Sequence, residues 1–591
     1  MYRTLARWCY HHRWTVVGVW IALIVGLNAA GAVIGSSFDS GFETPASESA
    51  SGFDTLEEYF PGASSVFGGQ IVFESQDGVT DPEIAEPMTE LFEEVGTIEG
   101  VTVVSPYTPF GAEQINEDGT IAFAQLNLAE DIDETESAVI GEEINELLPE
   151  VDGLRIEIGG AAFAEFEPPE SELIGLAFAI VVLILSFGSV LAMGLPIGIA
   201  VAGVGAGGFG LVSLLTNVFT IPEFAPLIGI MIGLGVGIDY ALLLVTRHRE
   251  FLAEGLTVAD AAGRAVATAG QAVIFAGGTV VIAILGLAVA GVPFMTAAGI
   301  ATSIIVAMMV IASVTLLPAF LGLSGHWINR LGIHRRHGIG GGVGSGWQRW
   351  GRHVTGHAWP YAIGVTVLLL ALSAPVLALR LGFPDEGTLP ESRTERVAYD
   401  LIADGFGPGL NGPLVVAVDL DSGGDTSVVT PLSEAIAADP GIAAVAPADI
   451  DEAAGIATIV AFPTTSPQDD ATFATVQRLR ADVFPEVLAD TPVTAHVGGQ
   501  TATFGDVADR VSQRLPWFIA SVVVLSVLLL TLVFRSVLVP IKAALLNLLS
   551  IGAAYGVLVM VFQWGWGKEL IGLETTVPIV SFIPMFMFAV L

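Results

Sequence analysis

Asp239 and Tyr240 lie in one of the most apolar stretches of the chain, FAPLIGIMIGLGVGIDYALLLV from Phe224 to Val245, where Asp239 is the only charged residue. A carboxylate at the centre of a membrane span costs about 3 kcal/mol, so an acidic residue there indicates a functional site. A carboxyl group at this depth, beside a phenol, can bind and release protons. We therefore predict that Asp239 and Tyr240 form a proton relay, with a buried structural hydrogen bond as the alternative.

Other residues of the same stretch are candidates for helix movement and proton entry. Four glycines precede the aspartate: Gly229, Gly233, Gly235 and Gly237. A spacing of four residues builds a ridge for close helix contact, so we predict helix packing or gating for this set. Glu223 begins the span near the outer surface, where it is predicted to be a surface cap, with a proton entrance as the alternative.

Composition indicates a membrane protein with two acidic domains. The chain has 591 residues, 53% of them hydrophobic, a mean hydropathy of +0.70 and a net charge of −39. Of the 61 acidic residues, 32 lie in 35–170 and 21 in 381–515, whereas most basic residues flank apolar stretches. The positive-inside rule places those flanks in the cytoplasm, and counting the spans before each acidic domain then predicts that both domains are extracytoplasmic. The charge argues against a nucleic-acid partner. No GxxxxGK[ST] motif is present, which argues against ATP.

The order of apolar and acidic stretches predicts seven segments. They are a cytoplasmic N-terminus with the first transmembrane helix (1–34), a first porter domain (35–170), transmembrane helices 2–6 (171–321), a cytoplasmic linker (322–357), transmembrane helix 7 (358–380), a second porter domain (381–515), and transmembrane helices 8 and 9 with the start of helix 10 (516–591). Between helices 4 and 5, residues 250–268 are predicted to form an amphipathic cytoplasmic helix.

The two acidic segments repeat one pattern, β-α-β-β-α-β. The first is predicted at 70–74, 82–96, 101–105, 120–127, 134–148 and 154–159, and the second at 414–420, 427–438, 442–446, 456–462, 469–488 and 493–498. Each ends in a Gly-Gly pair just before the next apolar stretch, Gly159-Gly160 and Gly498-Gly499. The fold class predicted is a polytopic α-helical membrane protein with two extracytoplasmic α+β, ferredoxin-like domains and an internal tandem repeat.

Three strings carry a resemblance to a known family. They are GLGVGIDYALLLVTRHRE (233–250), EFLAEGLTVADAAGRAVATAGQAV (250–273) and FAGGTVVIAILGLAV (275–289). With them the chain resembles the MMPL family (mycobacterial membrane protein large) of the resistance-nodulation-division superfamily. The resemblance implies twelve spans, two porter domains outside the cytoplasmic membrane, and proton-driven export of lipids or other hydrophobic compounds.

The same resemblance implies that Asp239 and Tyr240 work with a second Asp-Tyr pair in span ten. Aligning Pro226 with Pro584 places that second aspartate six positions beyond Leu591, so the expectation is a C-terminally truncated member.

The expected partners are membrane lipids and a hydrophobic or lipid substrate, with a homo-oligomer left open. Protons are the expected coupling ion, and neither a cofactor nor a metal is predicted. An intramembrane aspartyl protease needs two membrane aspartates, and this chain offers one, so we predict no enzyme. The alternatives are a non-transporting receptor or scaffold and a protein-export accessory protein of the same superfamily.

Overall fold

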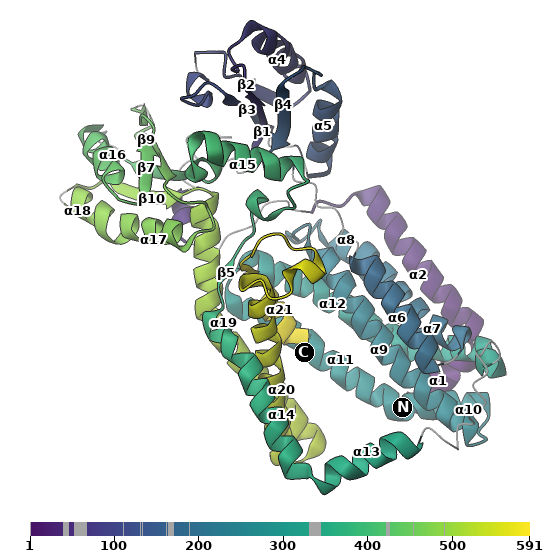
Figure 1. The fold of residues 1–591 in the computed structure, drawn as a ribbon. Helices are drawn as coiled ribbons and strands as arrows, with labels where there is room; N and C mark the ends of the chain where they lie inside the picture. Colours follow the sequence, from purple (N-terminus) through teal and green to yellow (C-terminus); the bar gives the residue numbers. More distant parts are fainter. Residues whose placement is uncertain are drawn as a thin grey trace.

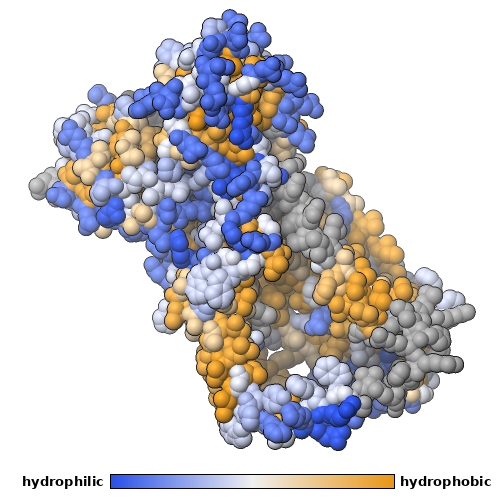
Figure 2. All heavy atoms as spheres, viewed as in Figure 1, coloured by the Kyte–Doolittle hydropathy of each residue, from blue (hydrophilic) through white to orange (hydrophobic). Residues whose placement is uncertain are grey.

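The structure is a computed structural model, and it describes residues 2–38, 47–52, 68–109, 111–129, 132, 134–160, 162–163, 171–187, 189–329, 344–420, 426–452, 454–489 and 491–590. Figure 1 shows long helices in the lower part and two small sheet-bearing parts above them. In Figure 2, hydrophobic side chains cover much of the outer surface of the helices, while hydrophilic ones predominate on the sheet-bearing parts.

Eight helices among the described residues are long and apolar enough to cross a membrane. They are α2 (Arg13–Ile34), α7 to α8 (Val190–Leu215), α9 (Ala225–Ala253), α10 to η4 (Val258–Ala290), α12 (Pro293–Ser324), α14 with η6 (Ala358–Ala378), α19 (Gln500–Phe534) and α20 with η11 (Leu538–Gln563). A further apolar helix, α6 (Ser171–Phe187), is shorter. The chain is a multi-pass helical membrane protein.

The helices form two groups. In the first, α12 is central and contacts α2, α7, α9 and α11 (Gln271–Leu285). It carries no charged residue and buries side chains along its whole length, from Met295 to Leu317, as expected for a helix that is apolar on every side. In the second group, α20 packs against α14 and α19, and α19 contacts α21 (Ile583–Val590). The groups meet where α19 contacts η4 and α21 contacts α11.

The first sheet-bearing part has the predicted β-α-β-β-α-β order. Its elements are β1 (Gly68–Ser75), α4 (Pro82–Val95), β2 (Val101–Val104), β3 (Ile121–Leu128), α5 (Glu134–Leu147) and β4 (Leu154–Gly159). The strands are antiparallel in the order β2-β3-β1-β4. Ile71 and Phe73 alternate along β1 and pack on Met88 of α4, because successive side chains of a strand point to opposite faces.

The second sheet-bearing part repeats that order. Its elements are β6 (Leu414–Asp419), α16 (Val429–Ala437), β7 (Ile442–Val445), β9 (Ile456–Pro463), a helix from α17 (Asp470–Arg478) through η10 to α18 (Phe484–Leu488), and β10 (Thr494–Gly498). The strand order β10-β6-β9-β7 matches that of the first sheet, and a short β8 (Asp449–Asp451) adds to β9. The glycines that follow the last strands, Gly160 and Gly499, have φ of 99° and 94°, so each repeat turns toward its membrane helix through a conformation that favours glycine.

Each sheet packs against a helical segment that precedes the other sheet in the chain. Helix α15 (Thr394–Phe406) comes just before the second sheet, but its Ala398 and Ile402 pack on Val72 of the first. The Ile158 amide of β4 donates to the Thr394 hydroxyl at 2.8 Å. Figure 1 shows α15 directly below the first sheet.

Conversely, the segment 47–52 precedes the first sheet and binds the second sheet-bearing part. The Ser49 hydroxyl donates to Asp506 of α19 at 2.6 Å, and Glu48 pairs with Arg480 at 3.2 Å. Arg480 also pairs with Asp506 at 2.6 Å and donates to the Val497 carbonyl of β10 at 3.0 Å. The two parts therefore exchange one helical segment each.

Several predicted boundaries differ from the structure. The prediction of one amphipathic helix at 250–268 is wrong: α9 ends at Ala253, and α10 starts at Val258 after a turn containing Gly255, whose φ is 90°. From there the helix continues into the next span. The last apolar stretch is helical only from Ile583, because Ile579–Val580 forms strand β11, which pairs with β5 (Leu381–Gly382). Most of the predicted 322–357 linker lies either outside the described residues or in the helix α13 (Gly344–Gly356).

Candidate functional site in the helical bundle

Helix α9 carries the predicted relay, and contacts at its two ends fix its position. It starts after Phe224, with Pro226 in its first turn, where a missing amide hydrogen costs nothing. At the other end, Arg249 donates to the Phe187 carbonyl at 3.0 Å and lies over the Phe187 ring at 5.6 Å. Arg247 pairs with Glu250 at 2.8 Å. Asp239 is the central residue of α9, with fourteen helical residues on either side.

Three of the four predicted glycines face neighbouring helices. Gly229, Gly233 and Gly237 are buried, and they lie against α12 and α7. A Cβ atom on Gly233 would lie 2.8 Å from Ile305 Cγ2, and one on Gly237 would lie 2.8 Å from Met309 Sδ and 3.3 Å from Ala200 Cα. These positions allow the close approach of α9 to both helices. A Cβ atom on Gly235, by contrast, would have no atom within 4 Å, so Gly235 is not part of this ridge.

Tyr240 is buried between α9, α11 and α12. Its side chain is 8% exposed, and it belongs to the same core cluster as Leu244 and Val273. A Cβ atom on Gly277 of α11 would lie 3.2 Å from Tyr240 Cε2, so this glycine makes room for the ring. The sequence prediction did not include Gly277, although the Gly277-Gly278 pair inside an apolar helix is a signal for close helix contact.

Asp239 lies on a different side of α9. It is exposed, as are Gly235 one turn before it and Met231 two turns before it. Successive helical residues are about 100° apart, so Asp239 and Tyr240 cannot share a face. In the part of the chain that the structure describes, no hydrogen bond or ion pair is found for the Asp239 carboxyl group. The two predicted relay residues are adjacent in sequence but point into different surroundings.

Glu223 lies at the far end of the same helix. It is exposed, next to the buried residues Ile221 and Pro222. Sixteen residues separate it from Asp239, which corresponds to about 24 Å along a helix. The structure thus places Glu223 at one surface and Asp239 midway between the two ends, and does not bring them into contact.

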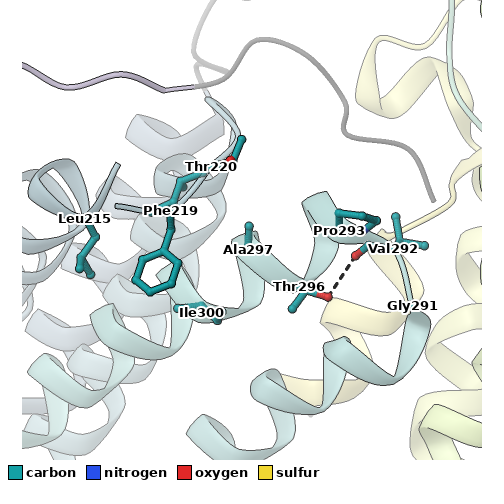
Figure 3. A pocket seen from close by; sticks show the side chains of 10 residues that line it. Leu215, Phe219, Thr220, Gly291, Val292, Pro293, Thr296, Ala297 and Ile300 are labelled. Carbon is teal, nitrogen blue, oxygen red and sulfur yellow. Dashed lines mark hydrogen bonds between the residues drawn. The ribbon is translucent and has the colours of Figure 1, made fainter. Parts of the chain in front are cut away.

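An apolar cavity of about 440 Å³ lies near the same end of the bundle as Glu223. Figure 3 shows Leu215 and Phe219 on one side of it and Ala297 and Ile300 of α12 on the other. The Thr296 hydroxyl donates to the Val292 carbonyl at 3.1 Å, so the main polar side chain of this wall is already satisfied. Its size falls within the range of small-molecule sites, and its lining suits a hydrocarbon. The sequence prediction contained no signal for this cavity, because its walls come from separate loops and helices.

A cluster of polar side chains lies outside the spans, between β5 and α15. The Tyr399 hydroxyl donates to Asp385 Oδ2 at 3.1 Å, and Arg396 donates to the Gly387 carbonyl at 2.6 Å. Burial raises the pKa of the Asp385 carboxyl to about 7, with a further contribution from the neighbouring Glu386, while the Tyr399 hydrogen bond opposes the shift. This carboxyl group therefore changes charge near neutral pH.

Comparison with known proteins identifies the family. The model of the MMPL family matches residues 42–363 and 420–590. The chain belongs to the MMPL family. Membrane protein YdfJ of Bacillus subtilis is 32% identical over all of this chain and 81% of its own length.

Two mycobacterial members have names that state an activity. The mycolic acid-containing lipids exporter MmpL11 of Mycolicibacterium smegmatis is 30% identical over 68% of this chain and 43% of its own length. The trehalose monomycolate exporter MmpL3 of Mycobacterium tuberculosis is 25% identical over 96% of this chain and 64% of its own length. The chain thus spans 43% and 64% of the length of these two relatives. The family and its lipid-exporting members support a transporter role.

Proposed function

We propose that this MMPL protein exports lipids or other hydrophobic compounds across the cytoplasmic membrane and is driven by the proton gradient. The observation that carries the proposal is Asp239, the only charged residue in the apolar stretch from Phe224 to Val245. Such a residue is costly in a membrane, and ionisable residues that occur there mark ion or proton pathways. Two exporters of lipids among the relatives support the same class of cargo.

The proposed mechanism follows from the different surroundings of Asp239 and Tyr240. Asp239 takes up a proton when its face of α9 is dry, because an unpaired charge there is too costly, and releases it when water has access. Tyr240, about 100° further around the helix, holds another side of α9 in the core against α11. The glycine ridge lets α9 slide or tilt against α12 as the charge on Asp239 changes. Proton occupancy is thereby coupled to helix packing.

The cargo and the sidedness complete the proposal. Both sheet-bearing parts are extracytoplasmic porter domains of ferredoxin-like type, since the basic residues flank the opposite ends of the spans. The apolar cavity beside Phe219 and Ile300 accepts the hydrocarbon part of the cargo at the outer end of the bundle. In this scheme protons are the coupling ion, and neither ATP nor a cofactor takes part.

The experiment compares Asp239→Asn with Asp239→Glu in proteoliposomes. A pH gradient is imposed, and the outward movement of a fluorescent lipid is followed together with the accompanying proton flux. Asparagine cannot carry a proton, so we expect gradient-driven export to fall at least a hundredfold, whereas glutamate should retain a measurable part of it. Melting temperature and reconstitution yield serve as controls for folding.

A receptor or scaffold of the same family predicts a different result. Under that alternative, neither variant moves lipid faster than protein-free vesicles, and the wild-type protein does not do so either. Export by Asp239→Asn at the wild-type rate would remove Asp239 from the mechanism and with it the observation on which the proposal rests.

A further inference from the structure

Helix α13 (Gly344–Gly356) projects from the helical bundle next to α14. Figure 1 shows it at the lower edge, turned away from the direction of α14, at the end of the bundle opposite the sheets. Nearly all of its residues are exposed, including two large aromatic side chains, Trp347 at 74% and Trp350 at 54%. At the start of α14, Trp359 is 79% exposed as well. Tryptophan side chains with such large exposed fractions are uncommon on a water-facing surface.

The sequence of α13 is amphipathic. Trp347, Trp350 and Val354 are spaced by three and four residues and fall on one side of the helix. Arg349 and Arg352 fall on the other side. Such a division, with tryptophan on one face and arginine on the other, is typical of helices that lie in the plane of a membrane surface.

Contacts at its end set the direction of α13 relative to the span that follows. The Trp350 ring packs edge-on against the Tyr361 ring of α14, with the ring centroids 5.7 Å apart. The His353 ring lies 5.8 Å from the same tyrosine ring. His357, between the two helices, has non-helical φ and ψ of −123° and 38°. The turn is therefore built by packed side chains, and it leaves α13 at the level where the apolar span begins.

We propose that α13 lies in the cytoplasmic membrane interface and binds the headgroups of anionic lipids through Arg349 and Arg352. The tryptophans enter the boundary between headgroups and acyl chains, which is the preferred position of this side chain. The two guanidinium groups reach lipid phosphates, which they match in geometry and charge.

The charge distribution favours an anionic lipid surface as the occupant. In a chain with 61 acidic residues, none lies between Asp260 and Asp385, and α13 falls within that interval. This surface is thus locally positive in a protein whose net charge is −39. A positive amphipathic helix that starts a membrane span meets anionic phosphates of the adjacent leaflet before any other partner.

The first test measures the depth of individual α13 positions in the full-length protein. The native cysteine is replaced by Cys9→Ala, and single cysteines at Val354, Gln348 or Gly356 carry a spin label in reconstituted vesicles. Collision with oxygen, which concentrates in lipid, is compared with collision with a water-soluble nickel complex. We expect the label at Val354 to be deep and those at Gln348 and Gly356 to be shallow. Equal depth at all three sites would overturn the proposal.

The second test measures the choice of lipid. A fluorophore at Gln348 is quenched by spin-labelled phosphatidylglycerol or by spin-labelled phosphatidylcholine at equal mole fraction. One arginine near an anionic surface contributes about fivefold, and the two factors multiply, so we expect a preference for phosphatidylglycerol on the order of 25-fold. The double variant Arg349→Gln/Arg352→Gln should lose this preference. The control Arg247→Gln removes an arginine that is already paired with Glu250 and should keep it. Equal quenching by both lipids in the unmodified α13 would refute headgroup binding.

Discussion

Replacing Gly233 by alanine tests whether the glycine ridge sets the distance between α9 and α12. The added Cβ would lie 2.8 Å from Ile305 Cγ2, whereas carbon atoms in contact are normally about 3.5–4.0 Å apart. The shortfall is about 0.7 Å or more. Ile305 is fully buried and β-branched, so its Cγ2 atom has essentially one position in a helix and cannot move aside without the helix.

The matched control is Gly235→Ala, two residues further along the same helix. A Cβ atom at Gly235 would have no atom within 4 Å. Both substitutions gain the same helix propensity, up to about 1 kcal/mol, so this contribution cancels in their comparison. Overpacking of a filled interface costs about 1–3 kcal/mol, and this is the stability difference that we expect between the two variants. Gly235→Ala should be at least as stable as the wild-type protein.

The assay is equilibrium unfolding in mixed micelles, with increasing mole fraction of a denaturing detergent and helix content as the readout. We expect the unfolding midpoint to be highest for Gly235→Ala, intermediate for the wild-type protein and lowest for Gly233→Ala. The same two variants are then compared in gradient-driven lipid export, where only Gly233→Ala should be slower. If both variants unfold at the same midpoint, the close contact of Gly233 with Ile305 does not support the packing of α9, and the role assigned to the ridge is wrong.

Two further predictions concern the parts outside the spans. The folded state holds the Asp385 proton more tightly than the unfolded chain, with a pKa of about 7, so stability should fall as pH rises from about 4 to 7. Asp385→Asn should flatten this fall in melting temperature, leaving the contribution of Glu386, whose pKa burial also raises. Tyr399→Phe should extend the fall to higher pH, and an unchanged profile in both variants would contradict the assignment. Single cysteines at the exposed positions Glu93 and Glu434 should react with an impermeant maleimide on intact cells, and protection of either would reverse the proposed sidedness.

Local patterns in the sequence were sufficient to predict the elements of both sheets. The short apolar run Ile71-Val72-Phe73 of β1 is a property of a few consecutive residues, and turn residues mark the ends of the strand. The four-residue spacing of Gly229, Gly233 and Gly237 likewise predicted a common face. Gly235 lies two residues off this spacing, so it falls on another side of the helix, and the structure shows it without neighbours.

Features that depend on contacts distant in sequence were not predicted. The sequence of α15 has the pattern of an amphipathic helix, but no local signal says that its apolar face covers the first sheet and not the adjacent second one. The pairing of β5 with β11 involves two residues on each side, too few for a periodic pattern. The separation of Asp239 from Tyr240 follows from helix geometry alone, but which of the two faces is packed depends on Gly277 and the other residues of α11.

Because the two sheet-bearing parts exchange helical segments, each is connected to both groups of membrane helices. The first sheet is followed in the chain by α6 of the first helical group, and it also packs on α15, which follows α14 of the second group. The second sheet is followed by α19 of the second group, and it also binds residues 47–52, which follow α2 of the first group. Each sheet is thus tied to helices of both groups. A shift of one helical group against the other therefore acts on both sheets, because neither sheet is tied to a single group.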